Sequence, residues 1–236
     1  MSSTNRGGKR RPSDYYPTPS WAVDRLLEEL YPAPEGLPGQ TGLPYVGQWV
    51  EPCAGSGAII RACPAWMSRC QYRRFDIQWT ANELQDDHGE LHNQPPSELR
   101  PISLQLRATG ARVTIGDALE WSPARPAGRF DVCLTNPPYS KAEAFVRWGL
   151  ANASCSIMLL RLGFLASAQR CALMRENPPD VFVLPNRPSF TANGRTDSAD
   201  YAWFVWRQPS GRRSGRVKVL RNTPMNERKL QKTIVD

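Results

Sequence analysis

Short apolar runs alternate with helical patterns along most of this chain of 236 residues. Apolar runs of strand length occupy residues 48–51, 111–115, 130–135, 156–160, 181–184 and 201–206. Apolar residues at helical spacing occur around Leu26, from residue 58 onwards, at 142–151 and at 166–174. Strands that alternate with helices predict an α/β fold, with a mostly parallel, doubly wound sheet between two layers of helices.

One predicted strand runs directly into a polar and aromatic tetrapeptide, Asn136-Pro137-Pro138-Tyr139. Ligands of open α/β sheets bind beyond the carboxyl ends of the strands, so these residues are candidates for a site. The Asn136 side-chain oxygen and the Pro137 carbonyl can each accept a hydrogen bond from a planar amine, and Tyr139 can stack on its ring. Two fixed acceptors favour a pyramidal nitrogen whose lone pair faces an electrophilic methyl group. The alternative is a Pro-Pro turn that only ends a strand.

A second strand, predicted at 48–51, leads into a turn that contains two glycines. Glu51 is followed by Pro52-Cys53-Ala54-Gly55-Ser56-Gly57, and a helical pattern starts immediately afterwards. Gly55 and Gly57 allow the backbone to approach a ligand where a Cβ atom would clash. The full GxGxxG dinucleotide signature is absent, because isoleucine stands where the third glycine would fall. The loop therefore favours a smaller, cationic cofactor over a pyrophosphate.

With the glycine loop and the tetrapeptide in this order, the chain resembles the S-adenosylmethionine-dependent amino-methyltransferases, in particular the N6-adenine DNA methyltransferases. The segment order is similar to that of the family's gamma group, and the C-terminal part resembles small phage and prophage members. Further matching segments are Tyr16-Pro17-Thr18-Pro19, Gly116-Asp117, 187–190, Thr196-Asp197 and 201–206. The resemblance covers roughly residues 15–207 and implies a Rossmann-like class I methyltransferase fold, whose last strand, at 201–206, is antiparallel.

The resemblance also implies S-adenosylmethionine as the cofactor and assigns roles to residues. The implied cofactor contacts are Tyr16, Pro17, Thr18, Glu51, Pro52, Ala54, Gly55, Ser56, Gly57, Glu83, Asp117 and Asn136. Glu83 would hold the ribose, with Asp76 as the alternative, and Asp117 would bind the adenine amine of the cofactor. Asn136, Pro137, Pro138 and Tyr139 would act on an adenine flipped out of the duplex. Because the sulfonium is already activated, neither a metal nor a covalent intermediate is expected.

The charge of the chain indicates a polyanionic partner, for which DNA is the expectation. The formal net charge is +8, and basic residues concentrate at the two ends. We therefore expect a basic arm at 1–14, the methyltransferase domain at 15–207 and a basic tail at 208–236, although these arms could equally be solvated. The six cysteines show no metal-ligand spacing, and no apolar run is long enough for a membrane span, which favours the cytoplasm.

Several alternatives stay open. The target amine could be N4 of cytosine, an RNA adenine or a protein glutamine, or the chain could be a non-catalytic subunit that binds nucleic acid. His88 and His92 are four residues apart, but Gly89 lies between them, so a metal site is not expected. Cys53 is not expected to act as a nucleophile. Phe190 could line a base pocket or pack in the core, and we expect core positions for Trp203 and Trp206. No separate recognition domain is evident, so we expect loose or very short sequence specificity, or a partner subunit that supplies it.

Overall fold

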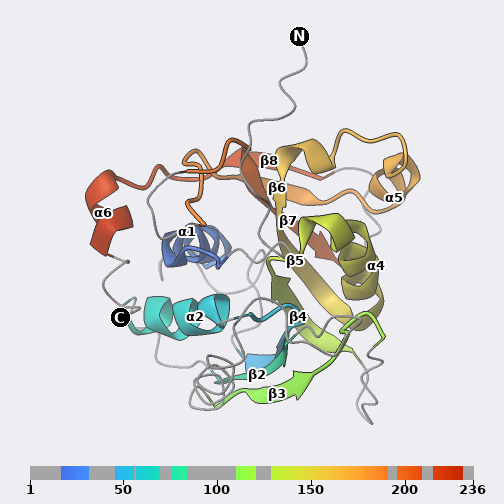
Figure 1. Ribbon diagram of the computed structural model, residues 1–236, viewed down its shortest axis with the longest axis horizontal. Helices are drawn as coiled ribbons and strands as arrows, with labels where there is room; N and C mark the ends of the chain where they lie inside the picture. Colours follow the sequence, from blue (N-terminus) through green and yellow to red (C-terminus); the bar gives the residue numbers. More distant parts are fainter. Residues whose placement is uncertain are drawn as a thin grey trace.

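The computed structural model describes residues 17–31, 46–55, 57–69, 76–83, 110–120, 129–190, 196–208 and 215–230. Within these residues, eight strands form one sheet in the order β3-β2-β1-β4-β5-β7-β6-β8 (Figure 1). The strands are β1 (Val46–Glu51), β2 (Asp76–Glu83), β3 (Arg112–Ile115), β4 (Phe130–Thr135), β5 (Ala153–Arg161), β6 (Asp180–Val183), β7 (Tyr201–Arg207) and β8 (Val217–Val219). The helices are α1 (Ser20–Leu30), α2 (Ala58–Arg69), α4 (Ala142–Asn152), α5 (Cys171–Glu176) and α6 (Met225–Leu230), with 3-10 turns η2 (Tyr139–Lys141) and η3 (Leu162–Phe164).

The sheet is mostly parallel, as the alternation of strands and helices predicts. Strands β3, β2, β1, β4 and β5 run parallel to one another, and β6 runs parallel to β8. Strand β7 is antiparallel to both of its neighbours, β5 and β6, which confirms the antiparallel strand expected at 201–206. The chain order reverses beside β1, and ligands of doubly wound sheets bind at such a switch point.

Helices cover both faces of the sheet, with α1 and α2 on one face and α4 and α5 on the other (Figure 1). Alternate residues of each strand face opposite layers. In β4, Leu134 packs on the side of α1 and α2, whereas Cys133 packs on the side of α4. In β7, Trp203 and Trp206 are buried in opposite layers, so their predicted core positions are confirmed. The Trp203 Nε1 donates a 2.8 Å hydrogen bond to the carbonyl of Ala22, which ties β7 to α1.

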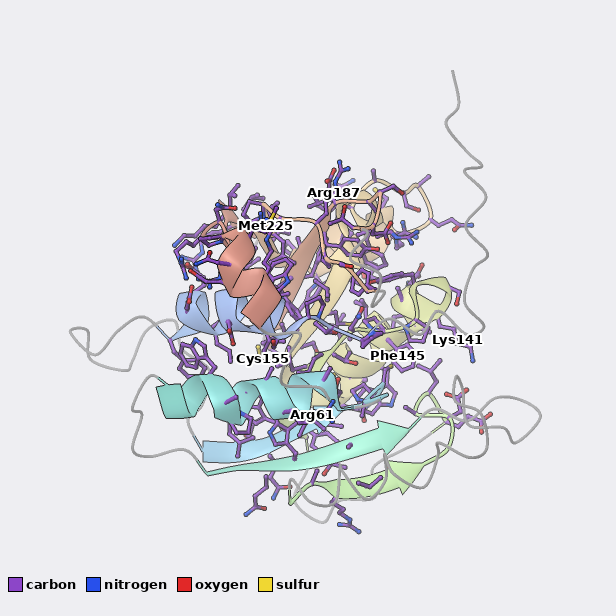
Figure 2. The ribbon with its side chains drawn as sticks, turned by 60° about the vertical axis from the view of Figure 1, so that its left-hand side comes forward. Arg61, Lys141, Phe145, Cys155, Arg187 and Met225 are labelled. Carbon is purple, nitrogen blue, oxygen red and sulfur yellow. The ribbon has the colours of Figure 1, made fainter. Side chains whose placement is uncertain are left out.

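Residues 215–230 contribute β8 and α6, neither of which the hydrophobic pattern predicts. This segment belongs to the stretch beyond residue 207 that the sequence suggests is a basic tail. Several of its cations pair with carboxylates of the domain: Lys218 with Glu29, Arg221 with Glu28 and Glu227, and Arg216 with Asp180. Helix α6 lies against α1 in both views, where Glu227 meets the buried Arg25 at 2.7 Å (Figures 1 and 2).

The helix expected at 166–174 is wrong in its first part, because α5 begins only at Cys171. Between β5 and α5 the chain makes the η3 turn, and the Ala166 N–H bonds to the Gly163 carbonyl at 3.2 Å. Arg170 then folds back over this turn. Its Nε donates a 2.9 Å hydrogen bond to the Phe164 carbonyl, and its Cζ lies 4.4 Å from the centre of the Phe164 ring. These side-chain contacts compete with a regular helix.

Several sequence predictions lie outside the described residues. They include the basic arm at 1–14, the cofactor contacts Tyr16 and Ser56, and the His88 and His92 pair. Among the residues that the structure does describe, no group of three or more histidine, cysteine or acidic side chains is placed to bind a metal. None of the described helices has the length and hydropathy needed to cross a membrane.

Candidate active site at the carboxyl edge of the sheet

The glycine loop and the tetrapeptide leave the sheet at the same edge. Strands β1 and β4 are parallel neighbours, with Val50 opposite Cys133, so the residues that follow both strands meet. The Cys53 thiol lies beside Thr135, the last residue of β4, and it is close enough to Glu51 and Asp117 to experience their charges. The loops after β1, β3 and β4 therefore come together around Cys53.

Two left-handed glycines shape the loop after β1. Gly55 has φ +48° and Gly57 has φ +74°, values that side chains with a Cβ rarely adopt. The Gly57 N–H bonds to the Ala54 carbonyl at 2.7 Å, and the Gly57 carbonyl accepts the Arg61 N–H at 3.0 Å. The second glycine thus closes a tight turn and provides the first carbonyl of α2. The sequence prediction of strand, glycine turn and helix is confirmed.

Glu51 ends β1 and is a buried carboxyl group with an unsatisfied oxygen. Its exposed fraction is 2%, and the Ile60 N–H of α2 bonds to its carboxylate. The Oε2 atom has no hydrogen-bond partner among the residues that the structure describes. Burial raises the pKa of Glu51 well above its usual value, while the charge of Arg61 and the Ile60 hydrogen bond act in the opposite direction. A cation beside Oε2 would restore the charged form, so this group fits a positively charged ligand.

The neighbouring Cys53 does not have the properties of a nucleophile. Burial raises the pKa of its thiol well above the usual value, and the charges of Glu51 and Asp117 raise it further. Because the thiolate is the reactive form of cysteine, a thiol that stays protonated reacts poorly. This agrees with the expectation that Cys53 has no covalent role.

The ends of β2 and β3 supply the acidic candidates for cofactor binding. Glu83 is the last residue of β2 and lies opposite Ile115 of β3, at the edge where the glycine loop emerges. Asp76 is the first residue of the same strand and pairs with Val46, so it lies at the opposite edge. Asp76 is therefore too far from the glycine loop to serve the same site. Asp117 follows β3 and accepts a 2.8 Å bond from the Leu119 N–H.

Lys141 is a site residue that the sequence does not single out. Its Nζ lies 3.5 Å from Asp117 Oδ2, and the Lys141 N–H donates to the Pro138 carbonyl at 3.0 Å. Lys141 therefore connects the loop after β3 with the tetrapeptide. In Figure 2 it lies beside the start of α4, while Arg61 projects from α2.

The tetrapeptide forms the bend between β4 and η2. Pro137 is buried, whereas Asn136 and Tyr139 are half-buried. Pro138 has φ −53° and ψ +123°, so it stays extended and the helical turn begins only at Tyr139. The Tyr139 hydroxyl then reaches back and donates a 3.1 Å hydrogen bond to Asn136 Oδ1. The predicted acceptor and the predicted stacking ring are thus held together.

Aromatic rings from the C-terminal half pack beside Tyr139. The Tyr201 ring centre is 5.6 Å from that of Tyr139, with an angle of 45° between the planes. Phe190 packs edge-on against Tyr201 at 5.2 Å and is buried, so it is part of the core layer beneath the site. Burial raises the pKa of both tyrosine hydroxyls, so both stay protonated at neutral pH.

Arg161 and Asp197 complete this corner of the site. The Arg161 Cζ lies 4.9 Å from the centre of the Tyr139 ring, and its Nε donates a 3.2 Å bond to the Tyr201 hydroxyl. The Tyr201 hydroxyl donates to Asp197 Oδ2 at 2.6 Å. Sequence reasoning missed Arg161. Its signal is a polar residue at the end of an apolar strand, and the polar Asn136, directly after β4, is found by the same kind of pattern.

No protein-family model matches the sequence, and no curated protein sequence matches it. Solved structures share its fold. A Listeria monocytogenes protein assigned as a class I S-adenosylmethionine-dependent methyltransferase matches with a TM-score of 0.56 at 9% identity, over 92% of this chain and 68% of that one. A Pyrococcus horikoshii protein assigned as an RNA methyltransferase matches with a TM-score of 0.53 at 13% identity, over 87% and 94%. A chain of a type I restriction–modification system matches with a TM-score of 0.53 at 16% identity, over 92% and 49%.

These similarities establish the fold. The chain has the Rossmann-like fold of class I S-adenosylmethionine-dependent methyltransferases, with a mostly parallel sheet and an antiparallel strand near its end. Because the sequence identities of these three structures are 16% or lower, the similarities by themselves do not identify the substrate of this chain.

Proposed function

We propose that this protein transfers a methyl group from S-adenosylmethionine to the N6 amine of an adenine in DNA. The observation that carries the proposal is the convergence of two groups at one sheet edge. Asn136 and Tyr139 are joined by a hydrogen bond after β4, and the glycine loop with the buried Glu51 follows the adjacent, parallel strand β1. A base amine and a cationic methyl donor could meet between them.

The cofactor part of the proposal uses the ends of β1, β2 and β3. The backbone of Gly55 and Gly57, together with Pro52, Ala54 and Ser56, would line the methionine portion, and the unsatisfied Glu51 oxygen suits its positive charge. Glu83 would accept bonds from the ribose hydroxyls, and Asp117 would accept one from the adenine amine. The segment before α1 would also contact the cofactor, through Tyr16, Pro17 and the buried Thr18.

The target part of the proposal uses the tetrapeptide. Asn136 Oδ1 and the Pro137 carbonyl would accept the two N–H bonds of the amine and turn its lone pair out of the ring plane. Tyr139 would stack on the base after it leaves the duplex. When bound, S-adenosylmethionine supplies an activated methyl group, so the chain's own residues need only orient the amine and exclude water.

The choice of substrate depends on charge and on Asn136. A net charge of +8 favours a nucleic acid over a protein substrate. The resemblance favours adenine, since N4-cytosine enzymes more often carry serine at the position of Asn136. The Pyrococcus horikoshii structure, which matches over 94% of its own length, is assigned as an RNA methyltransferase, so RNA adenine is the second candidate.

Purified protein, labelled S-adenosylmethionine and unmethylated duplex DNA provide the decisive test, with N136A as the control. N6-methyladenine in digested DNA that disappears with N136A supports the proposal. N4-methylcytosine would keep the mechanism and change the base, and label in RNA or in protein alone would refute the DNA substrate. Cofactor binding without transfer to any of these substrates would favour a non-catalytic subunit. Equal loss of turnover and cofactor binding in N136A would contradict the role given to Asn136.

A further inference from the structure

Arg161 lies beside the tetrapeptide, yet the methyl-transfer proposal gives it no task. It is the last residue of β5 and pairs in register with Tyr201, the first residue of β7. Strand β5 runs parallel to β4, with Met158 opposite Thr135. Arg161 therefore reaches the same carboxyl edge of the sheet as Tyr139.

The guanidinium of Arg161 is held on two sides. Its Cζ lies over the Tyr139 ring, 4.9 Å from the ring centre, and its Nε donates to the Tyr201 hydroxyl at 3.2 Å. Its Nη2 is 3.8 Å from Asp197 Oδ2, the oxygen that accepts the 2.6 Å bond from Tyr201. The side chain is 45% exposed, but these contacts give it a defined position rather than that of a solvated arginine.

Asp197 and Tyr201 form a rigid support for this arginine. Asp197 Oδ1 accepts the Ala199 N–H at 3.2 Å, and the Asp197 N–H donates to the Pro188 carbonyl at 3.0 Å. Tyr201 is fully buried in the sheet. The contacts with Tyr201 and Asp197 therefore position the guanidinium from β7 and the loop before it, in addition to its contact with the Tyr139 ring.

We propose that Arg161 is a positioning residue for the target base, because it fixes the Tyr139 ring in the orientation that stacks on that base. The inference rests on the proposed function. A guanidinium attracts the face of an aromatic ring, and here the arginine is anchored at the end of β5 while the ring belongs to the short η2 turn. A ring with a cation on one face presents the opposite face to the base, so the base is received on one side only. Loss of the arginine would remove one of the contacts that hold the ring, beside the hydroxyl bond to Asn136 and the contact with Tyr201, and would so widen the range of orientations that the ring adopts.

An exposed arginine in a nucleic-acid enzyme could instead contact a phosphate. The two roles differ in what they require of the side chain. A phosphate contact needs mainly the charge, so lysine would replace arginine, and its loss would lower the slope of log K against log salt by about one. A positioning role needs the planar group and the Nε–H bond to Tyr201, which lysine cannot supply.

The test compares R161Q, R161K, Y201F and the double variant R161Q/Y201F, with R170Q as the matched control. Arg170 makes the same kind of ring contact, with Phe164, and also donates a bond through Nε, but it does not touch the tetrapeptide. We expect R161Q and R161K to lower kcat about tenfold, with the cofactor Kd and the salt dependence of DNA binding unchanged. Y201F should lower kcat less than R161Q does. The double variant should lose no more activity than R161Q, because both changes disrupt the same interaction between Arg161 and Tyr201. R170Q should stay within about twofold of the wild type.

Rescue by R161K together with a reduced salt slope in R161Q would overturn the positioning role in favour of a phosphate contact. Equal losses in R161Q and R170Q would show a general effect on folding and would also overturn it. If the wild-type protein methylates no substrate, the proposed function fails and the role toward a target base fails with it, but crystal structures of the wild type and R161Q still decide whether Arg161 fixes the Tyr139 ring. A Tyr139 ring that keeps its orientation in R161Q would refute it, and a reoriented or disordered ring would support it.

Discussion

The Tyr139 hydroxyl donates a hydrogen bond to Asn136 Oδ1 across 3.1 Å. An amide oxygen has two lone pairs, so Oδ1 can accept the bond from Tyr139 and a second bond from the amine in the proposed complex. Since a phenol hydroxyl protonated at neutral pH is the donor, the bond also sets which side of the Asn136 amide carries the oxygen. Tyr139 would thus do more than stack, because it orients the acceptor that the reaction needs.

Tyr139→Phe separates these two tasks. The variant keeps the ring and loses only the hydroxyl, so we expect kcat to fall about two- to tenfold, the range of one net hydrogen bond. Tyr139→Ala also removes the stacking surface and should lower turnover below the detection limit of the assay. Steady-state methyl transfer to DNA with both variants measures the difference. Equal activities of the two variants would show that the ring does not act as we describe, and wild-type activity in Tyr139→Phe would show the same of the hydroxyl.

The left-handed glycines of the loop after β1 permit a matched comparison. Gly57 (φ +74°) and Gly110 (φ +79°) both adopt a left-handed backbone conformation, but Gly110 lies outside the glycine loop, and a Cβ atom there would meet no atom within 4 Å. Alanine at either position should cost about 1–2 kcal/mol of stability. Only G57A should also weaken the binding of S-adenosylmethionine, by at least tenfold, as measured by calorimetry. Equal cofactor affinity in the two variants would argue against a close approach of the cofactor to Gly57.

Most of the sheet follows from the hydrophobic pattern, because strands such as β4, β5 and β7 are runs of apolar residues with a clear end. The strand predicted at 130–135 is found as Phe130–Thr135, since its neighbours are polar or proline. Strand β8 has only three residues, Val217–Val219, all of them exposed. It is held by pairing with β6 and by ion pairs such as that of Lys218 with Glu29. These contacts join residues that are far apart in sequence, so no local pattern encodes them.

The site was predictable to a similar extent. Residues at or just beyond the end of a strand, such as Glu51 and Asn136, can be recognised from the sequence because the strand ends define the edge of the sheet. The relative places of Glu83 and Asp76 needed the bounds of β2, which put one residue at each end of the strand, and the ribose contact of Glu83 stays a prediction. Arg161 is positioned by a hydrogen bond to Tyr201, which lies 40 residues later in the sequence. Its contact with Tyr139 could therefore be found only from the structure.

Glu51 predicts an unusual pH dependence. Its pKa is raised in the folded state by burial, so its contribution to stability is complete below the unfolded pKa, about 4.3, and is lost as the pH rises through the folded value. Without cofactor, the wild type should therefore lose thermal stability relative to E51Q as the pH increases over this range. Unfolding midpoints of both proteins at a series of pH values measure this.

The same carboxyl group should make cofactor binding depend on pH. A cationic ligand favours ionised Glu51. At pH values below the folded pKa, the Kd of S-adenosylmethionine should therefore fall by up to about tenfold for each unit by which the pH rises. E51Q should bind more weakly and with a flatter pH profile. Parallel pH profiles for the wild type and E51Q would show that Glu51 does not face the positive charge of the cofactor.

The contact between α1 and α6 gives a prediction about stability alone. Arg25 has only 4% of its side chain exposed and pairs with Glu28 at 2.6 Å and with Glu227 at 2.7 Å. E227Q removes one carboxylate from a buried cation and should lower the free energy of unfolding by about 2 kcal/mol, less than for an arginine left with no partner.

E143Q is the matched control, because Glu143 pairs with Arg147, which is 58% exposed, and it should change stability by less than about 0.5 kcal/mol. Urea unfolding measures both variants. If the two changes were equal, α6 would contribute nothing through this pair, whereas a larger effect of E227Q would establish residues 225–230 as part of the folded domain.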